Sequence, residues 1–216
     1  MSWTPLETDP ESLNEYIHKL GCPDNWEFLE LYSLDDDFLS SVPRPCISIV
    51  LLYPLSSKYC EEKDFESDCF FMKQSLSNSC GSIALIHTLA NTAELTQIPK
   101  ESQLYSLINS AKNLDPAQKS SLIEKSSLIT EMHKEISQKG QTQAPDPESK
   151  TNLHFVSLCD INGSLVKFDG RNSLPKDLGK IKNDLLTESA IYAKSLIEKN
   201  PGDPNFCVLA LVEKSS

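Results

Sequence analysis

The segment Gln74-Ser75-Leu76-Ser77-Asn78-Ser79-Cys80-Gly81-Ser82 leads directly into an amphipathic run over 83–90. A cysteine at that junction lies where a loop becomes a helix, and the first N–H groups of a helix carry a partial positive charge that stabilises a thiolate. Gln74 could supply a second hydrogen-bond donor for an oxyanion. The pattern predicts that Cys80 is a nucleophile, and a buried, inert cysteine is the alternative.

Composition limits the classes of function. The chain has 216 residues, 39% of them apolar, and 31 acidic against 20 basic side chains give a net charge of −11. Such a chain can bury a sizeable core, and no break in composition indicates a second domain, so one domain over 1–216 is expected. Nucleic-acid binding is not expected because a phosphate backbone needs a basic face, whereas a basic partner would be attracted.

The cysteines and the apolar segments indicate the environment. Seven cysteines are odd in number and show no C-x-x-C pairing, so neither a disulfide framework nor a metal site is predicted. The N-terminus lacks the basic and apolar blocks of a signal peptide, and the longest apolar stretch, 47–55, is too short to span a bilayer. We expect a soluble protein of the cytoplasm, with the nucleus as a second location and no membrane partner.

The pattern of helix signals and apolar runs predicts a layered domain of mixed α and β structure. Asp9-Pro10 and Gly21 are typical of the start and the end of a helix. The acidic stretch 56–68 is expected to be an exposed connection, and 138–152 a long loop, since it has two prolines and no large aliphatic side chain. Helices are predicted over 10–20, within 33–41, and over 79–92, 101–113, 115–139 and 180–199, and strands over 26–32, 46–53, 153–159, 164–168 and 206–212.

The dipeptide Asn162-Gly163 is the most typical of a two-residue hairpin loop. In that register His154 and Asp169 are diagonal neighbours on one face, within side-chain reach. A three-residue loop would send His154 to the other face. The two-residue register predicts a nucleophile, a base and an orienting carboxylate in Cys80, His154 and Asp169.

Structural roles are the alternatives for these residues. His154 could be a satisfied structural histidine, and Asp169, which precedes a glycine, could be a turn residue. The other histidines have weaker claims. His18 and His133 lie in predicted helices without an evident partner, and His87 is two helical turns from Cys80.

Four blocks of the sequence closely resemble the ubiquitin C-terminal hydrolase (UCH) family of cysteine peptidases. The active-site block comprises Phe70-Phe71-Met72-Lys73-Gln74, Asn78-Ser79-Cys80-Gly81-Ser82 and Leu85-Ile86-His87. Further blocks at 20–26, 42–45 and 153–171 agree in order and spacing. The resemblance implies an α+β, papain-like fold with αβα layers around a mainly antiparallel central sheet, a knotted backbone, and no metal or organic cofactor.

The resemblance also implies roles for individual residues. Gln74 would be the oxyanion side chain, Cys80 the nucleophile, His154 the general base and acid, and Asp169 the residue that orients His154, while His87 would be structural. The reaction would be hydrolysis after the C-terminal glycine of ubiquitin through a thioester, which makes the protein a deubiquitinase. Small adducts and flexible peptides would pass beneath an active-site crossover loop near 138–152.

Substrate contacts follow from the same resemblance. Pro5, Leu6 and Leu153 match apolar ubiquitin-facing positions, and Glu30 matches an acidic one; without the match, Leu6 would be an ordinary staple to the first helix. The partner would be ubiquitin or a ubiquitin-like modifier, and a stand-alone monomer is expected. A ubiquitin-holding protein with slow turnover is a competing function, and a redox-responsive protein, oxidised at Cys80, is a third.

Overall fold

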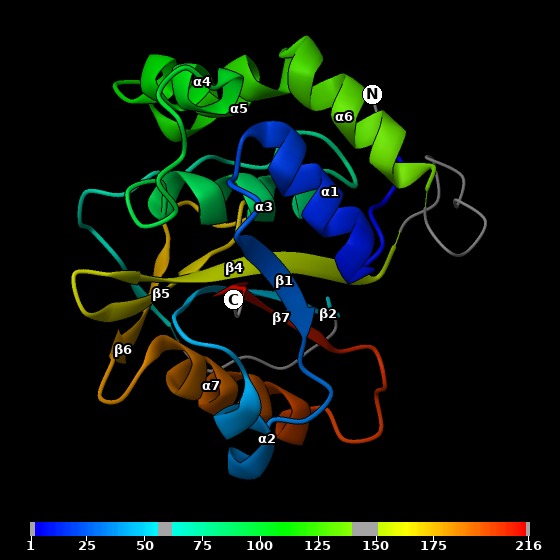
Figure 1. Cartoon of the computed structure of the whole chain (residues 1–216), viewed down its shortest axis with the longest axis vertical. Coiled ribbons are helices and arrows are strands. Elements are labelled where there is room, and N and C mark those ends of the chain that lie inside the picture. The colour runs from blue at the N-terminus through cyan, green and yellow to red at the C-terminus, as the bar shows by residue number, and fades with distance from the viewer. Residues whose placement is uncertain (1–2, 56–61, 140–150, 215–216) are drawn as a thin grey trace.

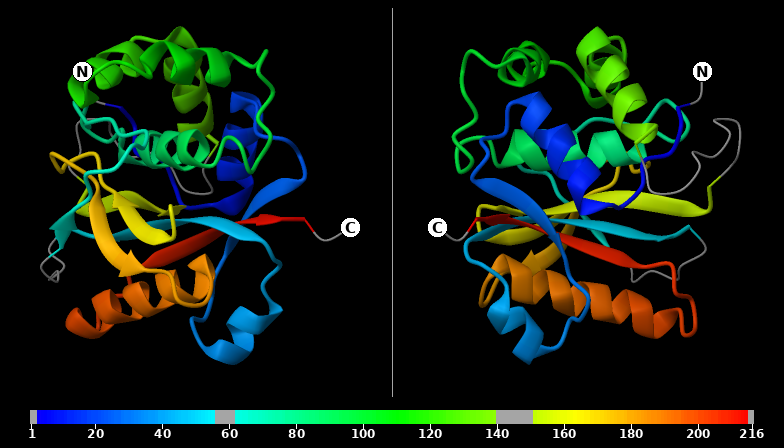
Figure 2. Two further views of the ribbon diagram at one scale, coloured as in Figure 1. Left: turned by 90° about the vertical axis from the view of Figure 1, so that its left-hand side faces the viewer. Right: turned by 45° about the vertical axis from the view of Figure 1, so that its right-hand side comes forward.

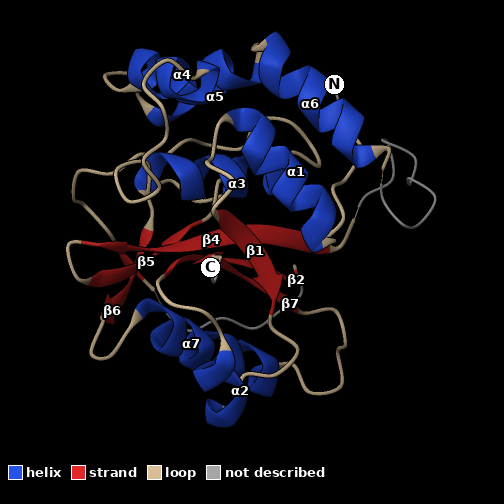
Figure 3. Ribbon diagram, viewed as in Figure 1, coloured by secondary structure: helices blue, strands red, loops and turns tan. Residues whose placement is uncertain are grey.

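The computed structural model describes residues 3–55, 62–139 and 151–214, which form one seven-stranded sheet with helices on both faces (Figures 1 and 3). The strand order is β1-β7-β2-β4-β5-β6-β3, and every neighbouring pair is antiparallel. The strands are β1 (Trp26–Glu30), β2 (Cys46–Pro54), β3 (Lys63–Asp64), β4 (Leu153–Ile161), β5 (Ser164–Phe168), β6 (Lys176–Lys180) and β7 (Cys207–Glu213).

Helices cover the two faces of the sheet unequally. On one face α1 and α3 lie against the strands, with α4, α5 and α6 outside them, and α2 and α7 cover the opposite face (Figure 2). The helices are α1 (Pro10–Leu20), α2 (Asp36–Ser41), α3 (Cys80–Asn91), α4 (Gln103–Ala111), α5 (Pro116–Glu124), α6 (Ser127–Ser137) and α7 (Leu185–Lys199). The predicted αβα layering and antiparallel sheet are therefore present.

The central strand β2 packs against a hydrophobic core on each face. Val50 belongs to the core under α1 and α3, whereas Ile49 and Leu51 belong to the core under α7. Side chains of a strand alternate between faces, so a run of aliphatic residues satisfies both cores. The prediction of a strand buried on both faces is confirmed.

Local signals in the first helix and in the hairpin are also confirmed. Asp9 caps α1 by accepting the Ser12 N–H at 2.9 Å, and Gly21 ends the helix at φ +108°. The β4–β5 loop is Asn162-Gly163, with φ values of +55° and +78°, and Ser157 pairs with Phe168 in the predicted register. Positive φ at both loop residues is the geometry that Asn-Gly favours.

Three element predictions differ from the structure. The helix predicted over 115–139 is broken at Lys125 and Ser126, between α5 and α6, and Ile123 before the break and Ile129 after it belong to the same core. Strand β6 was not predicted, since its sequence has little apolar alternation and contains Gly179 at φ +111°. As a result α7 begins only at Leu185, after its N-cap Asp184.

The connection predicted over 56–68 contains the two-residue strand β3, whose side chains are exposed. Most of the loop predicted over 138–152 lies outside the described residues. Helix α6 ends at Ser137, and β4 begins at Leu153. The knotted path stays a prediction.

Candidate active site

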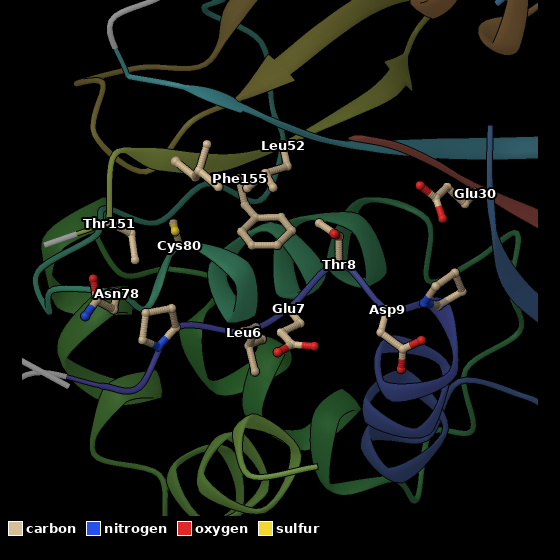
Figure 4. Close-up of a pocket in the computed structure, with 13 residues that line it drawn as sticks. Leu6, Glu7, Thr8, Asp9, Glu30, Leu52, Asn78, Cys80, Thr151 and Phe155 are labelled. Carbon is tan, nitrogen blue, oxygen red and sulfur yellow. The ribbon is translucent and has the colours of Figure 1, made fainter. Parts of the chain in front are cut away.

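Cys80 is the first residue of α3. The first intrahelical bond joins Ile83 N to Ser79 O at 3.0 Å, so the N–H groups of the first turn are directed out of the helix end. Residues 81–89 are buried throughout, which holds the helix rigidly between the sheet and the outer helices. Cys80 itself is only partly buried, and its thiol faces a pocket (Figure 4).

The structure brings His154 and Asp169 together. His154 is on β4 and Asp169 follows β5, and Nε2 of the imidazole lies 2.7 Å from Oδ1 of the carboxylate. The side chains are 4% and 11% exposed, so water competes little for this hydrogen bond. Because Nε2 is hydrogen-bonded to Asp169, Nδ1 is the ring nitrogen that is available to a thiol.

Two opposing effects set the protonation of this pair. Burial lowers the pKa of His154, but the hydrogen bond with Asp169 and the interaction with the Cys80 thiol outweigh it and raise that pKa to about 9. Burial raises the pKa of Asp169, but the hydrogen bond and charge of His154 outweigh it and hold that pKa below its usual range. The raised pKa of His154 keeps the imidazole protonated at neutral pH, beside the Cys80 thiol.

Gln74 lies next to the turn that carries Asp169. Its backbone N–H donates to Gly170 O at 2.7 Å, and its side-chain Nε2 donates to Leu76 O at 3.0 Å. Because a carbonyl oxygen only accepts, the amide must present its NH2 group to Leu76. One N–H of that group is used there, and the second can serve a ligand.

A pocket of about 480 Å³ runs from Cys80 along the N-terminal segment to Glu30. In Figure 4, Cys80, Asn78 and Thr151 lie at one end of the pocket and Asp9 and Glu30 at the other. The predicted contact residues Pro5, Leu6, Glu30 and Leu153 all line it. Leu6 is only 7% exposed, and most of its surface packs into the core beside Gly81.

Sequence reasoning missed several lining residues: Leu52, Asn78, Thr151 and Phe155. Asn78 is marked by one unusual feature, a φ of +63°, and its amide donates to Trp3 O at 2.9 Å. That bond fixes the N-terminal segment along the pocket. An asparagine shortly before the cysteine was a usable signal, since Asn tolerates positive φ better than most residues.

The remaining histidines have structural partners. Nε2 of His87 accepts the Met72 N–H at 3.1 Å, and its ring stacks on Phe71 at 5.3 Å, which agrees with the structural role expected of it. His133, which had no evident partner in the sequence, lies 2.7 Å from Ser82 Oγ and 2.7 Å from Thr4 O. His18 Nε2 lies 2.8 Å from Trp26 O.

Metal-binding groups, disulfides and membrane-spanning helices are absent from the described ranges 3–55, 62–139 and 151–214. No group of His, Cys, Asp and Glu there could hold a metal ion, and the six cysteines in these ranges are free thiols. No helix in the same ranges has the length and apolar character needed to cross a membrane.

Comparisons with known proteins identify the family. The model of ubiquitin carboxyl-terminal hydrolase, family 1, matches residues 3–198. A ubiquitin carboxyl-terminal hydrolase of Drosophila melanogaster is 34% identical over 98% of this chain and 97% of its own length. One of Aplysia californica is 32% identical over 92% of this chain and 96% of its own length.

Solved structures agree with the fold. The UCH37 catalytic domain of Trichinella spiralis, bound to ubiquitin vinyl methyl ester, matches with a TM-score of 0.77 at 21% identity, over 99% of this chain and 97% of that chain. The predicted α+β, papain-like fold class is thereby confirmed. Together with the family model and the relatives, this shows that the chain belongs to the ubiquitin carboxyl-terminal hydrolase family 1 of cysteine peptidases.

Proposed function

We propose that this protein hydrolyses the bond that follows the C-terminal glycine of ubiquitin, with Cys80 as the nucleophile. One observation carries the proposal: Cys80 starts a buried helix at the edge of a pocket, and the protonation of the nearby His154, which Asp169 holds in place, responds to the Cys80 thiol. Ubiquitin as the partner is supported by the relative of known structure, which is bound to ubiquitin vinyl methyl ester.

In the first step the Cys80 thiolate attacks the terminal glycine carbonyl carbon, and the C=O electron pair moves onto oxygen. The backbone N–H of Cys80 and the second N–H of the Gln74 amide would donate to that oxyanion. When the pair returns, the C–N bond breaks and the imidazolium of His154 gives its proton to the leaving amine. The product is a thioester between Cys80 and ubiquitin.

In the second step water attacks the thioester carbonyl. His154, now neutral, takes a proton from the water, and the oxyanion forms again at the same donors. Its collapse breaks the C–S bond and releases ubiquitin with a free carboxylate. Asp169 would serve both steps, because a carboxylate at Nε2 holds the ring in one orientation and stabilises its charged form.

The lining of the pocket offers a substrate apolar side chains and a negative charge. Pro5, Leu6 and Leu153 line the pocket with apolar side chains. Glu30 places a negative charge at the end away from Cys80 (Figure 4). A net charge of −11 would attract a basic region of the substrate, and Glu30 would meet it there.

Several finer expectations belong to the same proposal. Residues 1–216 would form one catalytic domain that acts as a monomer in the cytoplasm and the nucleus. The single sheet supports one domain, because its strands come from both ends of the chain. The preferred leaving groups would be small adducts and flexible peptides, and the partner would be ubiquitin or a ubiquitin-like modifier.

The proposal is tested with ubiquitin that carries a fluorogenic amide at its C-terminus, and with the equivalent substrate made from a ubiquitin-like modifier. Wild type should release the fluorophore and Cys80→Ala should not, although both should bind ubiquitin. Exposed Glu131 on α6 provides a matched control, and Glu131→Ala should react like wild type. Tight binding by wild type without release would instead indicate a ubiquitin-holding protein.

A further inference from the structure

Helix α5 lies along the segment that precedes Cys80. Pro116, Ser120 and Glu124 are spaced by four residues, so they share one side of α5. The Lys73 N–H donates to Pro116 O at 3.1 Å, and the Ser120 hydroxyl donates to Lys73 O. One side of the helix thus holds the backbone immediately before Gln74.

Glu124, the last residue of α5, binds the next two residues of that segment. Its Oε1 accepts the backbone N–H groups of Ser75 and Leu76, each at 3.2 Å, and its Oε2 accepts the Ser75 hydroxyl. A carboxylate has only acceptor oxygens, and all three partners are donors. Hydrogen bonds to a charged acceptor are stronger than those between neutral groups.

The backbone at 75–76, which Glu124 binds, in turn holds the two donors of the proposed oxyanion site. Leu76 O accepts the side-chain Nε2 of Gln74 at 3.0 Å and the hydroxyl of Ser79 at 2.9 Å. Ser79 is the N-cap of α3 and precedes Cys80. A shift of Leu76 would therefore move the Gln74 amide and the start of the catalytic helix together.

We propose that Glu124 is a positioning residue for the oxyanion site: it holds the 75–76 backbone so that the Gln74 amide and the N–H of Cys80 converge on one point. The inference rests on the proposed function, because it assigns an oxyanion to that point. Glu124 does not line the pocket that contains Cys80, so it acts through Leu76 and Gln74 rather than by touching substrate.

Three substitutions separate the geometry of the side chain from its charge. Glu124→Gln keeps the oxygen that accepts both N–H groups, so its kcat should stay within about threefold of wild type. Glu124→Asp keeps the charge but is one methylene shorter, and Glu124→Ala removes the acceptor. Both should lose about 10- to 100-fold in kcat with KM unchanged, because only the transition state carries the oxyanion.

Two further measurements distinguish positioning from a general structural defect. Alkylation of Cys80 by iodoacetamide, followed by mass spectrometry of the peptide that contains Cys80, needs the thiolate but no oxyanion, so its rate should change by less than about threefold in all three variants. A ubiquitin derivative with a C-terminal aldehyde forms a tetrahedral adduct with the thiol, and its binding should weaken by the same factor as kcat falls. If Glu124→Ala does not fold, Glu124→Asp carries the test, with thermal unfolding as the check on each variant.

A double-mutant cycle tests the route through Gln74. Gln74→Ala should lower kcat, and adding Glu124→Ala should lower it by no more than about twofold further. Glu131→Ala is the control that changes none of these values. Wild-type kcat in Glu124→Ala and Glu124→Asp, or losses that add fully to that of Gln74→Ala, would overturn the inference; an inactive wild type would overturn the proposed function and the inference with it.

Discussion

Oδ1 of Asp169 lies 2.7 Å from Nε2 of His154 and 2.9 Å from the backbone N of Arg171, so one carboxylate oxygen closes a turn and holds the imidazole. The sequence left two interpretations of Asp169 open, a turn residue and a partner of His154. In the structure the carboxylate makes both contacts. The turn orients the carboxylate, and the carboxylate orients His154. Rigidity of the turn thus contributes directly to the site.

Substitutions of Asp169 should separate orientation from charge. Asp169→Asn keeps an oxygen for both hydrogen bonds but loses the charge that raises the pKa of His154 to about 9. In wild type kcat should persist until the pH approaches 9 and then fall, because His154 must be protonated to release the amine. In Asp169→Asn that fall should move to lower pH, with kcat reduced about 10- to 100-fold near neutrality.

The measurement is the alkaline limb of kcat against pH for wild type, Asp169→Asn and Asp169→Ala. The Asp169→Ala variant should show the same shift and a larger loss of kcat, because it also removes the hydrogen bonds to the His154 ring and to the Arg171 N–H. An alkaline limb that stays in place in Asp169→Asn would contradict the role of the carboxylate charge.

Gly170 allows the turn to approach the oxyanion segment closely. A Cβ atom at this position would lie 3.0 Å from Gln74 N, 3.1 Å from Gln74 Cβ and 3.2 Å from Ile83 Cγ2. Gly170→Ala should therefore push Gln74 and the catalytic helix away from Asp169 and lower kcat about tenfold or more. Steady-state kinetics with the fluorogenic substrate measures this.

Gly202→Ala is the control for that variant. Gly202 has open space around it but a φ of +83°, so alanine there strains the backbone locally without moving the site. It should lower the temperature of unfolding and leave kcat unchanged. Equal kcat in Gly170→Ala and wild type would show that the close contact at position 170 is unimportant.

His133 should influence substrate binding rather than chemistry. Thr4 O only accepts, so His133 donates to it from Nε2; its Nδ1 then accepts from Ser82, whose oxygen accepts the Tyr16 hydroxyl at 2.8 Å. This chain of hydrogen bonds ties α1, α3 and α6 to the segment that supplies Pro5 and Leu6 to the pocket. His133→Ala should raise KM about two- to tenfold with kcat unchanged. That factor corresponds to the free energy of about one hydrogen bond.

The control for His133→Ala is His18→Ala. His18 also contacts a backbone carbonyl, Trp26 O at 2.8 Å, but does not line the pocket. Its KM should equal that of wild type. A lower kcat at unchanged KM in His133→Ala would show that the hydrogen-bond chain acts on the helix of Cys80 instead.

Two buried histidines should make folding sensitive to acid. Burial lowers the pKa of His87 from 6.5 to about 3 and that of His133 to about 4, so the unfolded chain binds two protons that the folded chain does not. Their contribution to stability is complete above pH 6.5 and is lost as pH falls, by about 1.4 kcal/mol per pH unit for each histidine. His154 has the opposite sign, because its stabilising contribution is lost as pH rises toward 9.

Urea unfolding at a series of acidic pH values measures this dependence. His133→Gln should remove about half of the acid-dependent slope between about pH 6.5 and about pH 5, since one of the two titrating histidines is lost and the carboxylates titrate at lower pH. An unchanged slope in His133→Gln would show that other groups control acid unfolding.

Features that depend on near neighbours in the chain were predictable from the sequence. The ends of α1 follow from Asp9-Pro10 and Gly21, and the register of β4 and β5 follows from Asn162-Gly163. That register is enough to bring His154 and Asp169 together. The start of a helix at Cys80 could be predicted for the same reason, because a helix end is set by residues within one or two turns.

Features that depend on packing between distant segments were not predictable. The break between α5 and α6 has no glycine or proline, and the residues on either side of it, Ile123 and Ile129, pack into one core with distant segments. Glu124 contacts residues 48 and 49 positions earlier in the chain, so nothing in its own neighbourhood distinguishes it from a surface glutamate.

The sequence by itself determined the helix start at Cys80 and the pairing of His154 with Asp169, because turn and capping preferences act over a few residues. Only the tertiary structure decided how the 73–76 segment is held, how closely Gly170 approaches it, and that Pro5, Leu6, Glu30 and Leu153 share one pocket with Cys80. These contacts join segments that meet only when the apolar faces of α3, α5 and the sheet are buried together, and burial is a property of the whole chain.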